Sequence, residues 1–192
     1  MISSKIMIAL FAAGLGFGFS IEHAEQGVPL VSLAPQRDPV WLRDLDSGYQ
    51  DLVNTMRQKG FTIEENASVC KQLDVLGFYA SGQRAIKICT DRMAQLYGES
   101  SAFLTILQQT IAHEAVHLAQ GCRQRRSGKP SLDLPAARLY GLPKSVRADI
   151  QKGLAMNTSS LPRSVQWRNE AEAMAMEDQP EQVIAALQQF CR

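Results

Sequence analysis

The sequence predicts an α+β fold that is mostly helical, with a small antiparallel sheet placed just before a long apolar helix. Apolar residues recur at helical spacing in several segments of the chain. Two short segments, 75–80 and 84–90, read as strands of a hairpin around a turn at 81–83. The chain has 192 residues and is 45% hydrophobic, enough for one domain with a core and too short for two comfortable ones. We therefore expect a single domain over 38–192.

The first residues are typical of a secretory signal. Residues 1–5 form a short basic start, and 6–19 form an apolar stretch shorter than the roughly 20 residues of a membrane-spanning helix. We expect a signal peptide over 1–24 and an extended leader over 25–37. The folded part is then exported (periplasmic, secreted or lumenal), with no stable membrane insertion once the signal is removed. An uncleaved signal would leave an N-terminal membrane anchor.

The first half of the domain is expected to contain two helices around the hairpin. Asp38-Pro39 has the form of a helix start, with apolar residues at helical period up to Lys59 and a stop at Gly60. Residues 61–63 could add a short strand. Ser100 or Ser101 caps the next helix, which should end at Gly121.

The second half is expected to be a loop followed by three helices. The basic residues at 123–126 should lie in a solvated loop, with a partner-binding patch as the alternative, and a proline-bearing loop follows over 127–143. Helices are then predicted over 144–156, from Pro162 to about Asp178, and from Pro180 to Phe190. A net charge of +1 gives no reason to expect a nucleic-acid partner.

Cysteine usage agrees with export. The four cysteines, Cys70, Cys89, Cys122 and Cys191, form an even set without C-x-x-C spacing, which favours two disulfides over a zinc ribbon. Four cysteines allow three pairings. We favour Cys70–Cys89 and Cys122–Cys191.

The segment "TIAHEAVHLAQGC" indicates a metal site. His113 and His117 are four residues apart, so on a helix their side chains lie about 40° apart on one face and can reach one ion. Glu114 can then address a water on that ion. H-E-x-x-H is the arrangement of zinc metallopeptidases, with two zinc ligands and a general base.

The third ligand should be a downstream carboxylate, because the chain has three histidines and the remaining one, His23, lies in the signal or leader. The candidates are Asp133, Asp149, Glu170, Glu172, Glu177, Asp178 and Glu181. Apolar residues surround Glu170 on a helical wheel, whereas Glu172 is predicted to face solvent and to form an ion pair with Arg168. We prefer Glu170, keep Glu172 as the alternative, and regard Glu177 as a weaker candidate or a group that orients a histidine.

At these residues the chain resembles the gluzincin type of zinc metallopeptidase. His113-Glu114-x-x-His117 is followed on a later helix by Asn169-Glu170-Ala171-Glu172-Ala173, similar to the N-E-x-E-A stretch in which the first Glu binds zinc. The resemblance implies a zincin-like domain with one Zn²⁺ per chain, and a last strand, here 84–90, that pairs with an extended peptide. One departure is Met174, where those families usually have an Asp or Asn that supports a histidine.

The leading hypothesis is a small exported zinc metallopeptidase acting on a peptide or protein substrate, with Glu114 as general base. Tyr140 and Arg168 are candidate donors to the oxyanion. Two alternatives remain. One is a non-catalytic binding domain stabilised by zinc, and the other is a metal-free helical interaction module stapled by disulfides.

Overall fold

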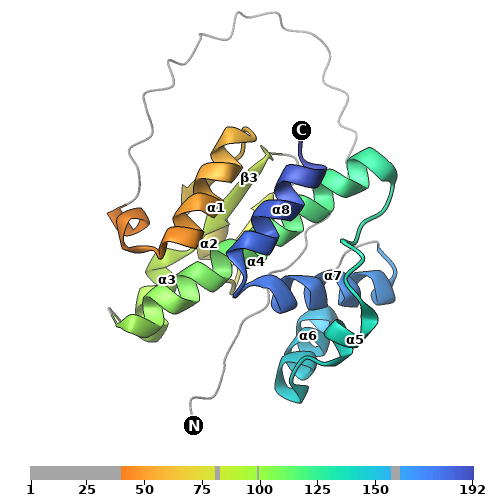
Figure 1. Cartoon of the computed structure of the whole chain (residues 1–192). Coiled ribbons are helices and arrows are strands. Elements are labelled where there is room, and N and C mark those ends of the chain that lie inside the picture. Colours follow the sequence, from red (N-terminus) through yellow and green to blue (C-terminus); the bar gives the residue numbers. More distant parts are fainter. Residues whose placement is uncertain (1–39, 81–82, 99, 157–160) are drawn as a thin grey trace, which may run out of the picture.

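A computed structural model describes residues 40–80, 83–98, 100–156 and 161–192. The predicted signal, the leader, the helix start at Asp38-Pro39 and part of the hairpin turn lie outside the described residues. Within them the α+β fold is confirmed, since most elements are helices and the long helix α4 packs on a small three-stranded sheet (Figure 1). In chain order the elements are η1 (Val40–Asp44), α1 (Ser47–Gln58), β1 (Thr62–Glu65), α2 (Val69–Gln72), β2 (Gly77–Ala80), β3 (Ala85–Ile88), α3 (Thr90–Tyr97), α4 (Ser101–Ser127), α5 (Ala136–Tyr140), α6 (Lys144–Met156), α7 (Arg163–Met176) and α8 (Pro180–Phe190).

The first predicted helix is interrupted. A 3-10 turn ends at Asp44, and α1 begins at Ser47 after Asp46 takes an extended backbone conformation (ψ 152°). The end is as expected, because Gly60 has a φ of +75°, which favours glycine. Leu52 and Met56 of α1 are fully buried in the main core.

The sheet is mixed and not purely antiparallel. β2 and β3 pair in antiparallel register, with Tyr79 opposite Ile86, as the hairpin prediction requires. β1 pairs in parallel with the other side of β3, so the strand order is β1-β3-β2. The central position of β3 explains why Ile86 and Ile88 are fully buried.

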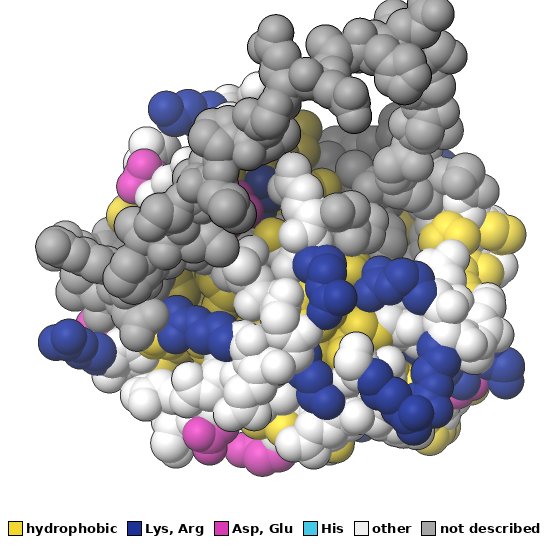
Figure 2. Space-filling view, turned by 90° about the horizontal axis from the view of Figure 1, so that it is seen from above, with side chains coloured by type: hydrophobic (Ala, Val, Ile, Leu, Met, Phe, Trp, Pro, Cys, Tyr) yellow, Lys and Arg dark blue, Asp and Glu magenta, His cyan; other side chains and the backbone are white. Residues whose placement is uncertain are grey.

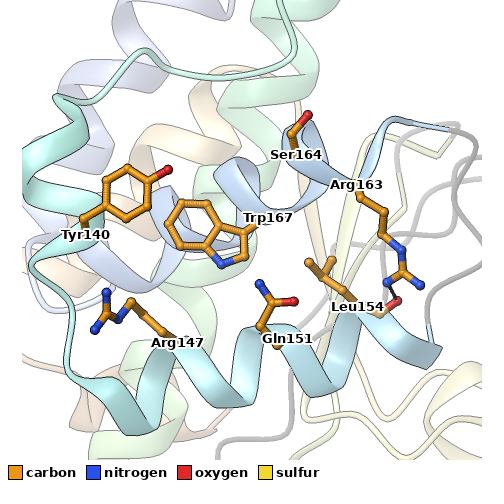
Figure 3. A pocket seen from close by; sticks show the side chains of 7 residues that line it. All are labelled: Tyr140, Arg147, Gln151, Leu154, Arg163, Ser164 and Trp167. Carbon is orange, nitrogen blue, oxygen red and sulfur yellow. Dashed lines mark hydrogen bonds between the residues drawn. The ribbon is translucent and has the colours of Figure 1, made fainter.

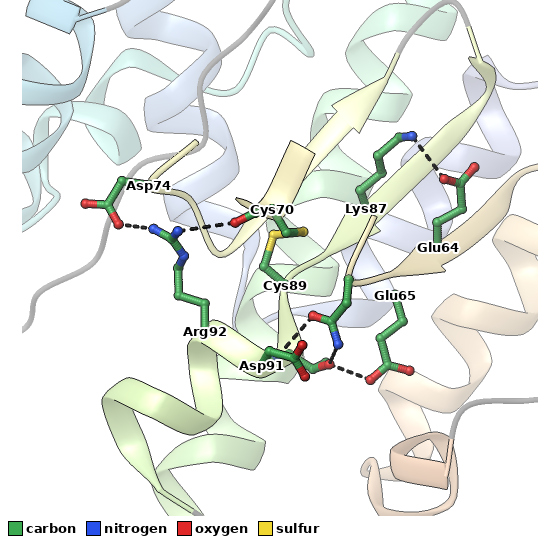
Figure 4. The surroundings of a disulfide bond; sticks show 10 residues. Glu64, Glu65, Cys70, Asp74, Lys87, Cys89, Asp91 and Arg92 are labelled. Atoms are coloured by element: carbon green, nitrogen blue, oxygen red, sulfur yellow. Dashed lines mark hydrogen bonds and ion pairs between the residues drawn. A yellow bond between two sulfur atoms is a disulfide. The ribbon is translucent and has the colours of Figure 1, made fainter. Parts of the chain in front are cut away.

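The Cys70–Cys89 disulfide fastens α2 to the end of the sheet, as the favoured pairing predicts. Figure 4 shows its surroundings, where Arg92 lies between Asp74 and the carbonyl oxygen of Cys70. The helix α3, which begins immediately after Cys89, was not expected from the sequence pattern. The disulfide and the Arg92 contacts together join α2, β3 and α3.

The central helix α4 is longer than predicted. It continues through Gly121 to Ser127 and ends at Gly128, whose φ is +71°. The basic residues at 123–126 therefore form its last turns and not a loop. Gly121 lies inside the helix, where it allows a close approach of Tyr79, because a Cβ there would lie 3.0 Å from the hydroxyl oxygen of Tyr79.

α4 packs against the sheet, α1, α7 and α8 (Figure 1). In the described part of the chain, neither α4 nor any other helix is both long and apolar enough to cross a bilayer. The helices α6, α7 and α8 lie close to their predicted ranges, and the short α5 falls within the expected loop. α5, α6 and α7 share a second small core. The Cys122–Cys191 disulfide, also as favoured, ties the end of α8 to α4.

Candidate metal centre

The two histidines of the H-E-x-x-H segment lie on the face of α4 that packs against α7. The helical spacing brings their rings together, with centroids 4.8 Å apart. Glu170, from the middle of α7, completes the group. Among the described residues, His113, His117 and Glu170 form the one cluster of this kind that could bind a metal ion.

The ligand atoms converge on a common point. The Nε2 atoms of His113 and His117 are 3.2 Å apart. Oε2 of Glu170 lies 3.5 Å from Nε2 of His113, and Oε1 lies 3.6 Å from Nε2 of His117. Three atoms bound to one tetrahedral zinc at its usual bond lengths would be about 3.3 Å apart. The two imidazole nitrogens are close to this spacing, and one ligand atom from each of the three residues lies within 4.8 Å of the others, so small side-chain shifts would bring them around one zinc-sized cation.

Each histidine is oriented through its other ring nitrogen. Oε2 of Glu177 lies 3.3 Å from Nδ1 of His113, and Oε1 of Gln120 lies 2.8 Å from Nδ1 of His117. Tyr49 fixes the backbone at Glu177 by donating its hydroxyl to the carbonyl oxygen of that residue at 3.0 Å. When Nδ1 donates a hydrogen bond, Nε2 is left with the lone pair that a metal requires.

The amide of Gln120 has a fixed orientation. Its Nε2 donates to the carbonyl oxygen of Asn169 and to Oε2 of Glu172, both at 3.0 Å. The amide oxygen must therefore face His117, which makes Nδ1 of His117 the donor. Gln120 thus links the first metal-binding helix to the second.

Glu172 is not the solvent-facing residue that the helical wheel indicated. Its predicted ion pair with Arg168 is present at 3.4 Å, but Glu172 itself is fully buried. It accepts hydrogen bonds from the backbone N–H groups of Leu132 and Leu134 at 2.6 and 3.1 Å. Both carboxylate oxygens of Glu172 are therefore engaged by groups outside the cluster. Glu170 is left as the third candidate ligand.

The pKa values of the cluster are set by burial and by the pairing of the histidines with the glutamates. Burial alone would lower the pKa of His113, but Glu170 and Glu177 outweigh it and raise that pKa to about 10. Burial alone would raise the pKa of Glu170, but His117 and His113 lower it to about 2. Without a metal, the cluster therefore contains a protonated His113 beside an ionised Glu170.

Glu114 lies beside the cluster with its carboxylate directed at β2. Burial raises the pKa of Glu114, and the two histidines oppose this shift. Both carboxylate oxygens are buried, and the backbone N–H of Tyr79 approaches the carboxylate, which lowers its pKa, without forming a hydrogen bond of normal geometry. A buried carboxylate without a good hydrogen bond lowers the stability of the fold, and such groups are frequent at functional sites. Gly77 of β2 makes room for Glu114, because a Cβ there would lie 2.9 Å from its Cγ.

The two candidate oxyanion donors make their contacts outside the cluster. Tyr140 is exposed and stacks on Trp167, with ring centroids 5.3 Å apart. Arg168 donates to the carbonyl oxygen of Leu134 at 2.7 Å and pairs with Glu172. No direct contact between either residue and a histidine is found in the described structure, and Arg168 is linked to His117 only through Glu172 and Gln120.

Two contributions to the centre were missed from the sequence. Gln120 lies three residues after His117 and so on the same face, which could have indicated its role as an orienting group. The backbone of residues 132–134 gave no such signal, because N–H groups in a loop have no sequence signature.

The chain was compared with known protein families, curated proteins and solved structures. The model of a domain family described as a domain of unknown function, DUF8637, matches residues 41–192. The chain belongs to this family. The matched range of DUF8637 contains the cluster, Glu114 and both disulfides. No curated protein and no solved structure matches the chain significantly.

Proposed function

We propose that this protein is a small exported metallopeptidase that binds one Zn²⁺ through His113, His117 and Glu170. The observation behind the proposal is the convergence of these three buried side chains next to the carboxylate of Glu114, which forms no hydrogen bond of normal geometry. Two imidazoles and a carboxylate form a usual ligand set of catalytic zinc, which leaves a fourth position for water or substrate. The two disulfides support the exported part of the proposal, because such bonds persist in oxidising compartments.

In the proposed hydrolysis, the ion and the side chains have separate roles. Zinc in such a site supplies a Lewis acid and lowers the pKa of water to about 7. Glu114 accepts the proton of the water that attacks the scissile carbonyl and passes it to the leaving amine. The raised pKa of Glu114 suits this exchange, since a general base works best with a pKa near the operating pH. Glu177 and Gln120 keep the imidazoles oriented.

The substrate-binding strand differs from the one that the family resemblance implied. β3 was expected to pair with a peptide, but it has β1 on one side and β2 on the other. β2 is an edge strand, and it passes Glu114 at Gly77. The N–H of Cys89 donates to the carbonyl oxygen of Leu76 at 2.9 Å, so the backbone of Leu76 faces the β3 side. Because successive residues of a strand point their N–H and C=O groups to opposite sides, those of Gly77 and Tyr79 point away from β3. We infer that an extended peptide pairs there, close to Glu114.

Zinc content and hydrolysis together test the proposal. The disulfide-bonded protein should contain one zinc per chain, and His117→Ala and Glu170→Ala should lose it. Glu181→Ala is a matched control, because Glu181 is an exposed glutamate on α8. Glu114→Gln should retain zinc but lose cleavage of a peptide library by at least about 10³-fold. A wild-type protein without zinc under non-chelating conditions would refute the proposal.

A second candidate function is a binding domain that zinc stabilises without catalysis. The burial of the cluster favours it, since His117 and Glu170 are only 1% and 2% exposed. For this function, zinc removal should lower stability, while wild type and Glu114→Gln should be equally inactive on every peptide tested. Peptide hydrolysis that depends on both zinc and Glu114 would exclude it.

A further inference from the structure

A basic pocket lies where three helices end, on the face viewed in Figure 2, where Lys and Arg side chains gather around exposed apolar surface. Its volume is about 340 Å³. It is lined by the side chains of Arg84, Arg125, Arg126 and Arg192, the rings of Phe61 and Phe190, and the Cys122–Cys191 disulfide. None of these residues belongs to the metal cluster.

Three of the four arginines of this pocket donate hydrogen bonds to uncharged acceptors. Arg84 donates to the carbonyl oxygen of Lys59 at 2.7 Å and lies over the ring of Phe61. Arg126 donates to the carbonyl oxygen of Gln189 at 3.0 Å, and Arg125 to the hydroxyl of Tyr79 at 3.4 Å. In the described structure no carboxylate pairs with any of the four.

Four other basic residues of the described structure pair with carboxylates. Lys87 pairs with Glu64, Arg92 with Asp74, Arg123 with Asp133 and Arg168 with Glu172. Arg138 and Arg163 elsewhere in the described structure also donate to uncharged acceptors, so the distinguishing feature of this pocket is that four arginines line it together, in a chain with a net charge of only +1.

The helix ends explain part of this basic character. α1, α4 and α8 all end at this face, and Arg84 and Arg126 donate to carbonyls at the ends of α1 and α8. Each helix C-terminus is equivalent to about half a negative charge. Three such ends offset about 1.5 of the four guanidinium charges, and about 2.5 positive charges remain.

We propose that this pocket binds a phosphate group. A phosphate monoester has a charge near −2 at neutral pH, which comes close to balancing the remaining positive charge, whereas a single carboxylate would not. Guanidinium groups bind phosphate oxygens in a bidentate manner, and each arginine here has N–H donors beyond the one or two it uses. The volume is at the small end of ligand pockets, which suits a headgroup-sized anion.

The phosphate could belong to a free small molecule or to a lipid headgroup, because the same oxygens would be recognised in both. Two probes separate these sources. Inorganic phosphate is titrated by calorimetry at low salt, and vesicles of phosphatidylcholine with and without phosphatidic acid are tested by co-sedimentation. Binding to either probe should weaken as salt is raised, because the contact is electrostatic.

The test variant is Arg125→Gln/Arg126→Gln, two exposed positions at the end of α4. The matched control is Arg147→Gln/Arg163→Gln, which removes the same charge from a second pocket between α6 and α7 (Figure 3). We expect the first variant to weaken binding at least about tenfold and the control to leave it nearly unchanged. Arg125→Lys/Arg126→Lys keeps the charge but not the forked donors, so it should restore binding only in part.

The outcomes are distinct. Inorganic phosphate binding that is lost in the test variant supports a free phosphate ligand. Binding to phosphatidic acid vesicles alone, with the same loss, supports a lipid headgroup. No binding to either probe, or equal loss in both double variants, overturns the proposal. The zinc content of each variant is measured as well, so that a fault in the metal centre is recognised separately.

Discussion

Glu177 Oε2 lies 3.3 Å from Nδ1 of His113, on the side of the ring away from the cluster. The resemblance proposed from the sequence alone predicts that a residue four positions after Glu170 supports a histidine. That position is Met174, which is buried in the second small core. Glu177, seven positions after Glu170, contacts the histidine here. The methionine at position 174 therefore does not leave His113 without a partner.

We expect Glu177→Gln to weaken zinc binding by about 10- to 100-fold, because the ring loses the anion that fixes its orientation and raises its basicity. Competition with a chromophoric chelator would measure the change. Asp178→Asn is the control, since Asp178 is exposed and its contact is with Gln109. Equal zinc affinity in wild type and Glu177→Gln would contradict this role.

Zinc binding should release about one proton per chain at neutral pH. The pKa of His113 is raised to about 10 in the metal-free protein, so this residue is protonated before the metal enters. Zinc affinity should then rise about tenfold per pH unit between about pH 6.5 and 8.5. Calorimetry in two buffers of different ionisation enthalpy would count the proton. Affinity that is independent of pH would be inconsistent with a protonated His113.

The stability of the metal-free protein should change with pH in the opposite direction. A raised His113 pKa stabilises the fold fully below pH 6.5, and that contribution is lost as pH rises through about 10. The lowered pKa of Glu170 contributes above pH 4.5 and is lost as pH falls towards 2. Urea unfolding of metal-free wild type and His113→Gln should show a difference that shrinks between pH 7 and 10. A constant difference would argue against the ion pair.

The residues of the cluster could be predicted because their signals are local. The spacing of His113 and His117 follows from helix geometry, and the apolar neighbours of Glu170 on its own helix indicate its buried face. The hairpin and the last three helices follow from periodicity and from prolines in the same way.

The rest depended on contacts between distant segments. Glu172 was misread because a helical wheel shows only the residues of one helix, and its backbone partners come from Leu132 and Leu134. Gly121 indicates a helix end in the sequence, but α4 continues through it and the ring of Tyr79, from β2, packs closely against it. Glycine signals a special backbone position or a close approach, and the sequence alone does not distinguish the two.

Gly77→Ala should destabilise the junction of β2 and α4. The added Cβ would lie 2.5 Å from Cγ2 of Thr110 and 2.9 Å from Cγ of Glu114, so the strand must move. We expect a loss of about 1–3 kcal/mol in the free energy of unfolding, measured in urea. Thr110→Ser removes Cγ2 and keeps the hydroxyl that bonds to the carbonyl of Ile106, so the double variant should recover part of the loss. No recovery would show that Thr110 is not the obstacle.

Glu172→Gln should destabilise the protein without removing a ligand from the metal. The carboxylate of Glu172 accepts from two backbone N–H groups and from Gln120, and an amide would direct N–H groups at donors. We expect a loss of about 2–3 kcal/mol in the metal-free protein, because buried donors lose their acceptor. Asp51→Asn, an exposed change on α1, is the control. Because Gln120 also orients His117, zinc affinity should fall less than in Glu170→Gln but more than in the control. If Glu172→Gln abolished zinc binding while Glu170→Gln retained it, the ligand assignment would have to be exchanged between these two glutamates.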